Sequence, residues 1–308
     1  MRIPLRTHRL ALVFCALISI SALAQTSPYK PGAPLLMWKV SSKTNSAYVL
    51  GSVHLADKSL YPLPSVIENA FAAASVLIVE ADMNKADKTQ LQQLMMTLGT
   101  YPPNDDLFHH ITPATRAKLS DFLGGYGIPP EAFAKFRPWM VSLMVVMLPM
   151  AKSGMNPNDG IDMYFLNKAG NKRVEQLEDA AWQIKLYAEF PESASDKSLS
   201  RTLTQAKDAS ETMTNFETYW TQGAVGKTES LMASLSADES KEEKAFERRL
   251  REDRNPHMAD RLEKCLQSSS ESCFMVVGAA HVIGNEGIVK LMQARGYKTE
   301  QAVVSGTK

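Results

Sequence analysis

The order of apolar and helical segments near the start of the chain constrains its fold more than any other feature. Residues 36–40 and 47–50 have the composition of two strands, and the polar residues between them suit a hairpin. An alanine-rich helix is expected over 65–74, directly before the continuous apolar run 76–79, which is typical of a buried strand. A strand, a helix and a second strand in this order indicate a parallel crossover unit, and therefore an α/β fold.

The rest of the chain extends this pattern. Further helices are expected over 90–98, 113–123, 130–136, 139–150, 183–187 and 285–295, with surface helices between 193 and 254 and strands over 173–177, 273–277 and 297–304. We expect a single domain over 25–308 of the α/β (α+β) class, with a mixed sheet, flanking helices and a largely helical insertion over about 85–172. The apolar run 139–150 is interpreted as a buried core helix, because a dozen residues are too short to span a membrane; a methionine-rich substrate groove is the alternative.

The first 24 residues have the pattern of a secretory signal peptide. Three arginines precede an apolar segment over 10–20, and residues 22–24 match the small-x-small motif of a cleavage site. Eleven apolar residues are too few to span about 30 Å of hydrocarbon, so we expect no stable membrane anchor after cleavage. The mature chain is expected to be periplasmic or secreted.

The charge of the chain argues against one class of partner. The whole sequence has 34 Lys and Arg residues against 33 Asp and Glu residues. Cleavage of the signal peptide would remove three arginines and no acidic residue, which leaves a slightly negative protein. Nucleic-acid binding depends on a surplus of positive charge facing the phosphates, so no nucleic-acid partner is expected.

Two cysteines remain after the predicted cleavage. Cys265 and Cys273 are separated by a short polar stretch, and in an oxidising compartment this spacing allows a local disulfide. Two free thiols are the alternative, because the sequence does not give the required geometry. A structural zinc site would need about four clustered Cys or His ligands, so it is poorly supported.

Two segments share an unusual order of residues. Each is an apolar strand followed by glycine, two small or apolar residues and histidine, ending in Gly51-Ser-Val-His54 and Gly278-Ala-Ala-His281. Glycine allows a sharp turn at the strand end and close backbone approach, and the carboxyl edge of an open α/β sheet is where ligands bind. Because histidine is the commonest metal ligand, we predict a shared functional site, with structural histidines as the alternative. The other histidines of the mature chain are expected to be solvated: His109, His110 and His257.

Carboxylates also follow predicted strands. Glu80 comes directly after the run 76–79, and Glu178 comes after 174–177. A charge at the end of a buried strand is costly unless it is paired or bound to a metal, so either glutamate is a candidate ligand or general base. Two nearby carboxylates are expected at the surface: Asp82 and Asp179.

One cation is a candidate for the same site. Arg254, followed by Asn255, could stabilise a carbonyl or an oxyanion, although an ordinary surface arginine on a charged helix is the simpler interpretation. Motifs of other chemistries are missing from the sequence: H-E-x-x-H, G-x-S-x-G, G-x-x-x-x-G-K-[ST] and G-x-G-x-x-G. No motif places a serine or cysteine nucleophile.

Taken together, these residues resemble the TraB/GumN family, which includes the Tiki-type proteases and is distantly similar to the erythromycin esterase and ChaN-like folds. The resemblance covers most of the mature chain, and its strongest segments are 50–55, 60–64, 79–82, 137–139, 160–162, 176–178, 254–255, 277–281 and 295–297. The family pattern consists of two G-x-x-H motifs, two glutamates and an arginine. In this sequence it selects His54, His281, Glu80, Glu178 and Arg254.

The resemblance implies a metal-dependent hydrolase, in the Tiki-type branch a peptidase acting on a peptide or protein. His54 and His281 would bind a divalent ion such as Mn, Co or Zn. One glutamate, with Glu80 as the candidate, would complete the metal shell and the other would accept a proton from water, although the sequence does not decide between them. Arg254 would bind or polarise the substrate carbonyl.

Two other functions stay open at this point. The same histidines could belong to a periplasmic metal- or haem-binding protein that does not turn over a substrate. A metal-independent, esterase-like hydrolase in which histidine activates water is the other alternative. The sequence does not indicate an oligomeric state.

Overall fold

The computed structural model describes residues 27–306, so the predicted signal peptide over 1–24 lies outside the described residues. The strands of this part of the chain form one six-stranded sheet in the order β4-β3-β5-β2-β1-β6. Their bounds are β1 Pro34–Ser41, β2 Ser46–Ser52, β3 Val76–Val79, β4 Arg173–Gln176, β5 Cys273–Gly278 and β6 Lys298–Val303. The predicted α/β class with a mixed sheet is confirmed.

The four strands β4, β3, β5 and β2 run parallel to one another, and β1 pairs antiparallel with both β2 and β6. In the parallel part, Gly51 of β2 is level with Val277 of β5, and Val79 of β3 is level with Val276. The carboxyl ends of these strands therefore lie at one edge of the sheet. Segments that are far apart in the sequence meet there.

Helices make up most of the remaining structure. Their bounds are α1 Ser65–Ala73, α2 Lys88–Gly99, α3 Pro113–Gly124, α4 Pro138–Lys152, α5 Ile161–Lys168, α6 Ala180–Ala188, α7 Glu192–Gln205, α8 Ala209–Thr221, α9 Val225–Leu235, α10 Lys241–Leu250, α11 Asn255–Gln267, α12 Ala279–Val282 and α13 Ile288–Ala294. Within the described residues, no helix has the length and apolarity needed to cross a membrane.

Two predicted helices differ from the observed ones near prolines. The helix expected over 130–136 is only a short 3-10 turn over Pro130–Phe133. The apolar helix expected to end near Pro149 continues to Lys152 as α4. Proline has no backbone N–H to donate, but the carbonyl oxygen of Pro149 still accepts the N–H of Ser153, so the helix continues beyond it. This helix is only partly buried, and Met147 is exposed.

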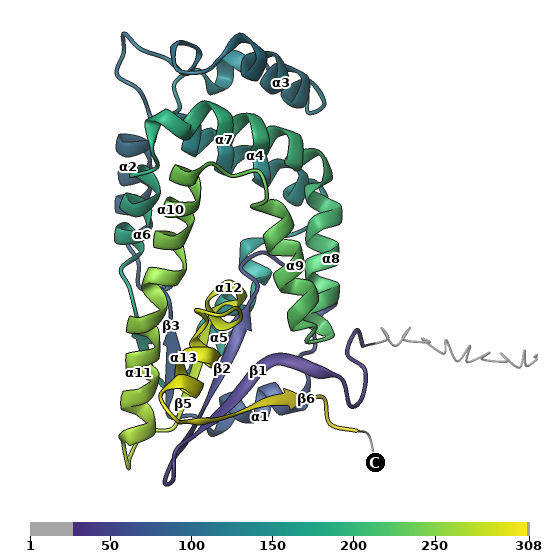
Figure 1. The fold of residues 1–308 in the computed structure, drawn as a ribbon, viewed down its shortest axis with the longest axis vertical. Coiled ribbons are helices and arrows are strands. Elements are labelled where there is room, and N and C mark those ends of the chain that lie inside the picture. Colours follow the sequence, from purple (N-terminus) through teal and green to yellow (C-terminus); the bar gives the residue numbers. More distant parts are fainter. Residues whose placement is uncertain (1–26, 307–308) are drawn as a thin grey trace, which may run out of the picture.

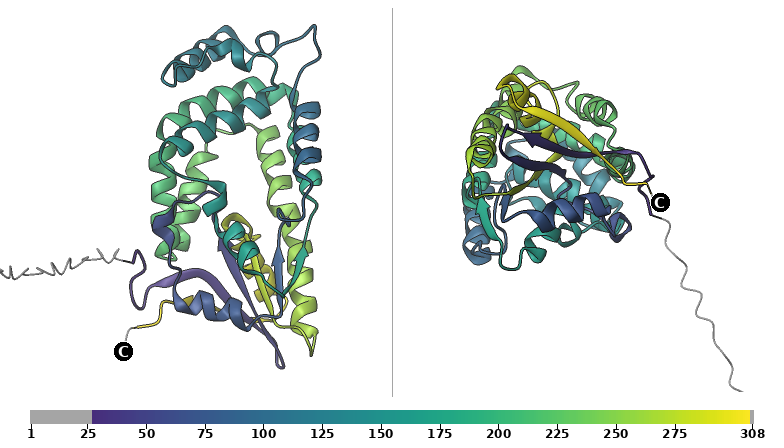
Figure 2. Two further views of the ribbon diagram at one scale, coloured as in Figure 1. Left: turned by 180° about the vertical axis from the view of Figure 1, so that it is seen from behind. Right: turned by 90° about the horizontal axis from the view of Figure 1, so that it is seen from below.

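The two faces of the sheet are covered by different helices. On one face, Phe71 of α1 and Phe165 of α5 pack around Phe274 of β5, with ring centroids 4.8 to 5.7 Å apart. Successive residues of a strand point to opposite faces, and Cys273 accordingly points to the other face, where it meets Cys265 of α11. The sheet is thus an inner layer between helices (Figure 2).

Beyond the carboxyl edge of the sheet, the long helices form a frame. In Figure 1, α10, α7, α4, α8 and α9 are arranged as an arch above α12, and α3 lies at the far end of the molecule. Contacts of α4 with α7 and α8, and of α8 with α9, hold this frame together. The helical part therefore stands over the edge where the parallel strands end.

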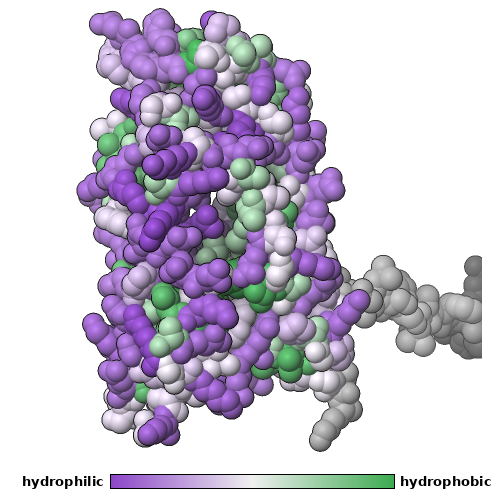
Figure 3. Space-filling view, in the orientation of Figure 1, coloured by the Kyte–Doolittle hydropathy of each residue, from purple (hydrophilic) through white to green (hydrophobic). Residues whose placement is uncertain are grey.

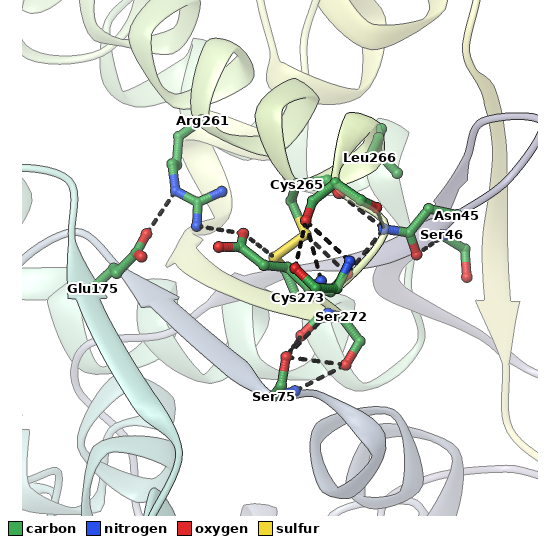
Figure 4. The surroundings of a disulfide bond; sticks show 12 residues. Asn45, Ser46, Ser75, Glu175, Arg261, Cys265, Leu266, Ser272 and Cys273 are labelled. Atoms are coloured by element: carbon green, nitrogen blue, oxygen red, sulfur yellow. Dashed lines mark hydrogen bonds and ion pairs between the residues drawn. A yellow bond between two sulfur atoms is a disulfide. The ribbon is translucent and has the colours of Figure 1, made fainter.

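The predicted disulfide between Cys265 and Cys273 is present and joins α11 to the start of β5 (Figure 4). The amide of Asn45 donates hydrogen bonds of 2.9 Å to the carbonyl oxygens of Cys265, Ser268 and Glu271 around the loop that the disulfide closes. The disulfide and these bonds fix the end of β5 that lies away from the carboxyl edge.

Replacing both cysteines by alanine (Cys265→Ala with Cys273→Ala) is expected to lower the free energy of unfolding by about 2–3 kcal/mol, because the bridge closes a loop of only eight residues. Urea denaturation of the mature chain, with and without a reductant, measures this difference. Reductant should lower the stability of the wild type and leave that of the double variant unchanged. Equal stability of the wild type and the double variant without reductant would show that the disulfide adds nothing to the stability of the fold.

Candidate active site

The five residues selected from the sequence lie at the carboxyl edge of the sheet. His54 follows β2, Glu80 follows β3, Glu178 follows β4, and His281 lies in α12 directly after β5. Arg254 reaches the same edge from the 3-10 turn η6 (Glu252–Arg254), just before α11. Four of the five, all except Glu178, line a cavity of about 610 Å³.

The two glycines of the histidine motifs are needed for space. Neither Gly51 nor Gly278 has a positive φ, so neither needs glycine for its backbone conformation. A Cβ atom on Gly278 would lie 3.0 Å from Nε2 of His54 and 3.2 Å from Oε1 of Glu80, and one on Gly51 would lie 3.0 Å from Cα of Ala279. The glycines therefore allow the neighbouring strand ends and their side chains to approach closely.

Glu80 lies at the centre of the site and is only 8% exposed. Its Oε1 accepts a 2.6 Å hydrogen bond from the N–H of Gly278, and its Oε2 accepts one of 2.6 Å from Nη2 of Arg254. The Nε2 atoms of the two histidines lie on either side, that of His54 4.0 Å from Oε1 and that of His281 3.7 Å from Oε2. Burial alone would raise the pKa of Glu80, but the charges that His281 and His54 carry when protonated, together with that of Arg254, outweigh it and lower the pKa to about 2. The carboxylate is therefore ionised.

His281 is buried and has a defined orientation. Its Nδ1 lies 2.7 Å from Oδ1 of Asn255, whose Nδ2 donates to the carbonyl oxygen of Glu286. Because the Asn255 oxygen can only accept, Nδ1 carries the proton and the lone pair of Nε2 faces Glu80. Burial, with a contribution from Arg254, lowers the pKa of His281 to about 4, so the ring is neutral near pH 7.

His54 is oriented by a different partner and is more open to the cavity, with 63% of its side chain exposed. Its Nδ1 lies 2.7 Å from Oδ2 of Asp162, and the other oxygen of Asp162 accepts a hydrogen bond from the hydroxyl of Ser52. The charge of Asp162 outweighs the partial loss of water around the ring inside the cavity and raises the pKa of His54 to about 9. A cation bound at Nε2 would have to replace the proton that this nitrogen carries.

Arg254 connects the two glutamates. Its Nε donates to Oε1 of Glu178 at 2.7 Å, its Nη2 donates to both Glu80 and Glu178, and its Nη1 donates to the carbonyl oxygen of Leu250. The side chain is only 11% exposed, so the alternative of a surface arginine is wrong. Burial alone would lower the pKa of Arg254, but its contacts with Glu178 and Glu80 outweigh burial and raise the pKa. Glu178 also accepts a 3.0 Å hydrogen bond from Gln183.

The remaining candidates lie outside this cluster. Asp82 is buried, contrary to expectation, because it pairs with Lys85 at 3.0 Å and accepts backbone N–H groups of the turn that follows β3. Asp179 is exposed as predicted and accepts the N–H of Ala181 at the start of α6. The other histidines are exposed or paired elsewhere: His109 and His110 with Asp105, and His257 on the surface of α11.

The donor set fits a divalent cation in its chemistry. Each of the two imidazoles is oriented by a hydrogen bond at Nδ1, as metal-binding histidines usually are. An ionised carboxylate lies between their Nε2 atoms. Donors bound about 2.1 Å from one ion are at most about 4.2 Å apart, and the two distances from Glu80 to the histidines satisfy this limit.

The three donors are not yet arranged as a compact set. Among residues 27–306, the group of three that brings one ligand atom each within 4.8 Å of the others is Cys265, Glu271 and Cys273, whose sulfur atoms are bonded to each other. For His54, Glu80 and His281 to bind one ion, at least one imidazole would therefore have to move so that the three ligand atoms lie closer together. His54, which is the more exposed ring, has room for this movement.

Asp162 and Gln183 belong to the site although no sequence pattern selects them, and Asn255, expected only as the neighbour of Arg254, orients His281. Asp162 lies in the first turn of α5, without a preceding strand, so the pattern that selected the glutamates could not find it. The only signal was its place in one of the segments of the family resemblance.

Comparisons with known proteins agree with this description. The family model described as the TraB/PrgY/gumN family matches residues 36–301. The uncharacterized protein YbaP of Escherichia coli (strain K12) is 26% identical over 147 residues, and YbaP of Shigella flexneri is 26% identical over 148 residues, in each case 47% of this chain and 53% of the relative. An uncharacterized protein of Treponema pallidum (strain Nichols) is 22% identical over 188 residues, 58% of this chain and 56% of that protein. The matched part of the chain thus spans about half the length of these curated relatives. No solved structure matches the chain significantly.

Proposed function

Because the chain belongs to the TraB/PrgY/gumN family, we propose from the geometry of its site that it is a metal-dependent hydrolase that cleaves peptide bonds. The observation that carries the proposal is the convergence of two histidines on one ionised carboxylate, with Nε2 atoms 4.0 and 3.7 Å from it, at the end of the parallel strands. This is a donor set for a divalent ion beside a cavity large enough for a substrate.

The roles of the site residues follow from their contacts. His54, His281 and Glu80 would hold the ion, because Glu80 lies between the two imidazoles. When bound, an ion such as Mn, Co or Zn supplies Lewis-acid activation of water and of a carbonyl group. Of the two glutamates, Glu178 is the one left for proton transfer, and Arg254 and Gln183 hold it in place.

Arg254 has little capacity left to bind a substrate. Its Nε and Nη2 groups donate to the two glutamates, and one N–H of Nη1 donates to Leu250. A guanidinium has five N–H groups, so one on Nη1 is left for a carbonyl oxygen. Its main role in this proposal is to hold both carboxylates in place and to keep Glu80 ionised.

Peptide cleavage by the mature chain tests this proposal. The protein is stripped of metal with a chelator and incubated with a peptide library in buffer alone or with Mn²⁺, Co²⁺ or Zn²⁺. Cleavage is expected only with added metal, and Glu178→Gln is expected to lower it by about 10²-fold or more while metal binding is retained. The matched control is Glu211→Gln, which changes an exposed carboxylate on α8.

The alternatives give different outcomes in the same experiment. Metal binding without cleavage of any peptide would contradict the hydrolase and favour a binding protein without turnover. Full cleavage in the presence of chelator would contradict metal dependence and favour the esterase-like mechanism.

Asp162→Asn is expected to weaken metal binding about 10- to 100-fold, since partners that orient a ligand histidine typically contribute this much. The substitution removes the charge that fixes Nδ1 of His54 and keeps the shape of the side chain. Titration calorimetry with Mn²⁺ measures the affinity, and Asp159→Asn, three residues earlier, is the control. Unchanged affinity of the Asp162 variant would show that His54 does not bind the ion through Nε2.

A further inference from the structure

A second cavity extends the space beside the site. It has a volume of about 380 Å³ and lies between α4, α7, α9 and α10. Six residues line both cavities and so connect them: Tyr187, Met232, Glu247, Leu250, Arg251 and Ala280. The space-filling view is hollowed near the middle of this face, with pale or green apolar residues inside and purple hydrophilic residues around the opening (Figure 3). A path therefore runs from the histidines into the helical frame.

The walls of this path are mainly apolar in the first cavity, and apolar and polar residues contribute equally in the second. The second cavity is lined by Trp139 and Leu143 of α4, Phe246 of α10 and Leu235 of α9. The first cavity has Met213 and Phe216 of α8 among its lining residues. The α4 residues at the second cavity come from its first turns and include none of its methionines, so a methionine-rich groove is not what this helix forms. Such walls fit an extended chain that carries apolar side chains.

Arg251 interrupts these walls at the junction of the two cavities. Of the arginines that line them, Arg254 is bonded to Glu80 and Glu178, and Arg201 is bonded to Glu243. Within residues 27–306, the side chain of Arg251 donates no hydrogen bond, and its acidic neighbour is Glu247, whose Oε2 lies 3.3 Å from Nε. The two Nη groups of Arg251 are therefore the donors left for a ligand.

The surroundings strengthen any bond that Arg251 makes. Its side chain is 32% exposed, and apolar residues such as Leu250 and Met232 share the junction with it. A charge-assisted hydrogen bond is stronger where water is partly excluded, and the planar guanidinium matches the two oxygens of a carboxylate. Glu239 lines the second cavity and not the first, so the negative charge of a ligand is favoured at Arg251 and disfavoured deeper in the second cavity.

We propose that the second cavity is a substrate subsite, and that Arg251 binds a carboxylate of an extended, apolar peptide in it. The carboxylate belongs either to the end of the peptide or to an acidic side chain, since both present the same group to the guanidinium. This inference rests on the proposed function, because it names the substrate that the hydrolase would take. Arg251 is here a specificity-determining residue, and it has no part in the cleavage itself.

The test uses binding, so that it does not depend on turnover. The probes are fluorescein-labelled apolar decapeptides in three forms: with a free C-terminal carboxylate, with a C-terminal amide, and as the amide with one internal glutamate. Fluorescence anisotropy with the Glu178→Gln variant is expected to show that the free acid or the glutamate form binds about 10-fold more tightly than the plain amide. Which of the two binds tightly identifies the source of the carboxylate.

Variants of Arg251 then assign the preference to this residue. Arg251→Gln is expected to reduce the preference to less than about 2-fold, and Arg251→Lys to retain part of it because the charge is kept. Arg248→Gln is the matched control, since Arg248 lies three residues earlier, in the last turn of α10, and lines neither cavity. Thermal unfolding of each variant verifies that it is folded.

Failure of this inference differs from failure of the proposed function. Equal affinity in all three forms, including no measurable binding of any, would overturn the subsite, as would a preference that survives Arg251→Gln. A carboxylate preference that depends on Arg251 supports the subsite even if no peptide is cleaved, and that result would contradict the hydrolase alone.

Discussion

Under the proposed function, replacing His281 by alanine is expected to abolish binding of a divalent ion and to lower peptide cleavage by about 10³-fold or more. The ring is buried and oriented by Asn255, so its Nε2 is ready to bind an ion without further ordering. A bound metal contributes several kcal/mol to stabilisation of the transition state, and each 1.36 kcal/mol corresponds to a tenfold change in rate.

Metal analysis of the purified mature protein measures the first part of this prediction. Wild type, His54→Ala and His281→Ala are compared, with His257→Ala as the control because that histidine is exposed on α11. His281→Gln provides a second variant that fills the buried space better, should the alanine variant unfold. The ligand assignment is wrong if all these folded proteins carry equal amounts of metal.

The second large effect is expected from Gly278→Ala, which adds a single methyl group. The new Cβ would lie 3.0 Å from Nε2 of His54 and 3.2 Å from Oε1 of Glu80, closer than side chains normally approach. Strand β5 lies between β3 and β2, so its backbone has no free side to which it can shift. We expect metal affinity and cleavage to fall about 10²-fold, since the methyl group occupies the space between two ligands.

Calorimetry with Mn²⁺ measures this loss, and Gly124→Ala is the matched control. A Cβ atom on Gly124 in α3 would meet nothing within 4 Å, so that variant should bind metal as the wild type does. If Gly278→Ala also binds normally, His54 and Glu80 do not converge on one ion.

The parts of the fold that depend on neighbouring residues could be predicted from the sequence. The strand Val76–Val79 has the predicted bounds, because four buried apolar residues between polar neighbours leave few alternatives. The common edge also followed from the sequence, since polar residues directly after buried strands must meet where parallel strands end. His54, Glu80, Glu178 and His281 are therefore predicted to lie close together.

The partners of these residues could not be predicted, because they come from segments without such a pattern. Asp162 orients His54 only because α5 crosses near the end of β2, and no local periodicity reports that crossing. Arg254 resembled a surface residue, since the charges around it alternate in sign, and its burial depends on two glutamates from other strands. The second cavity depends on how four helices are arranged, which no single segment determines.

The place of β5 in the sheet has a consequence for how the protein matures. This strand is separated from β3 by most of the helical part of the chain, yet it lies between β3 and β2. Before it inserts, His54 and Glu80 lie on two strands that do not pair, and Gly278 and His281 are absent from the edge. Long-range pairing of this kind is slow compared with local folding. A partly synthesised chain is therefore without the complete site until β5 has been inserted between β3 and β2.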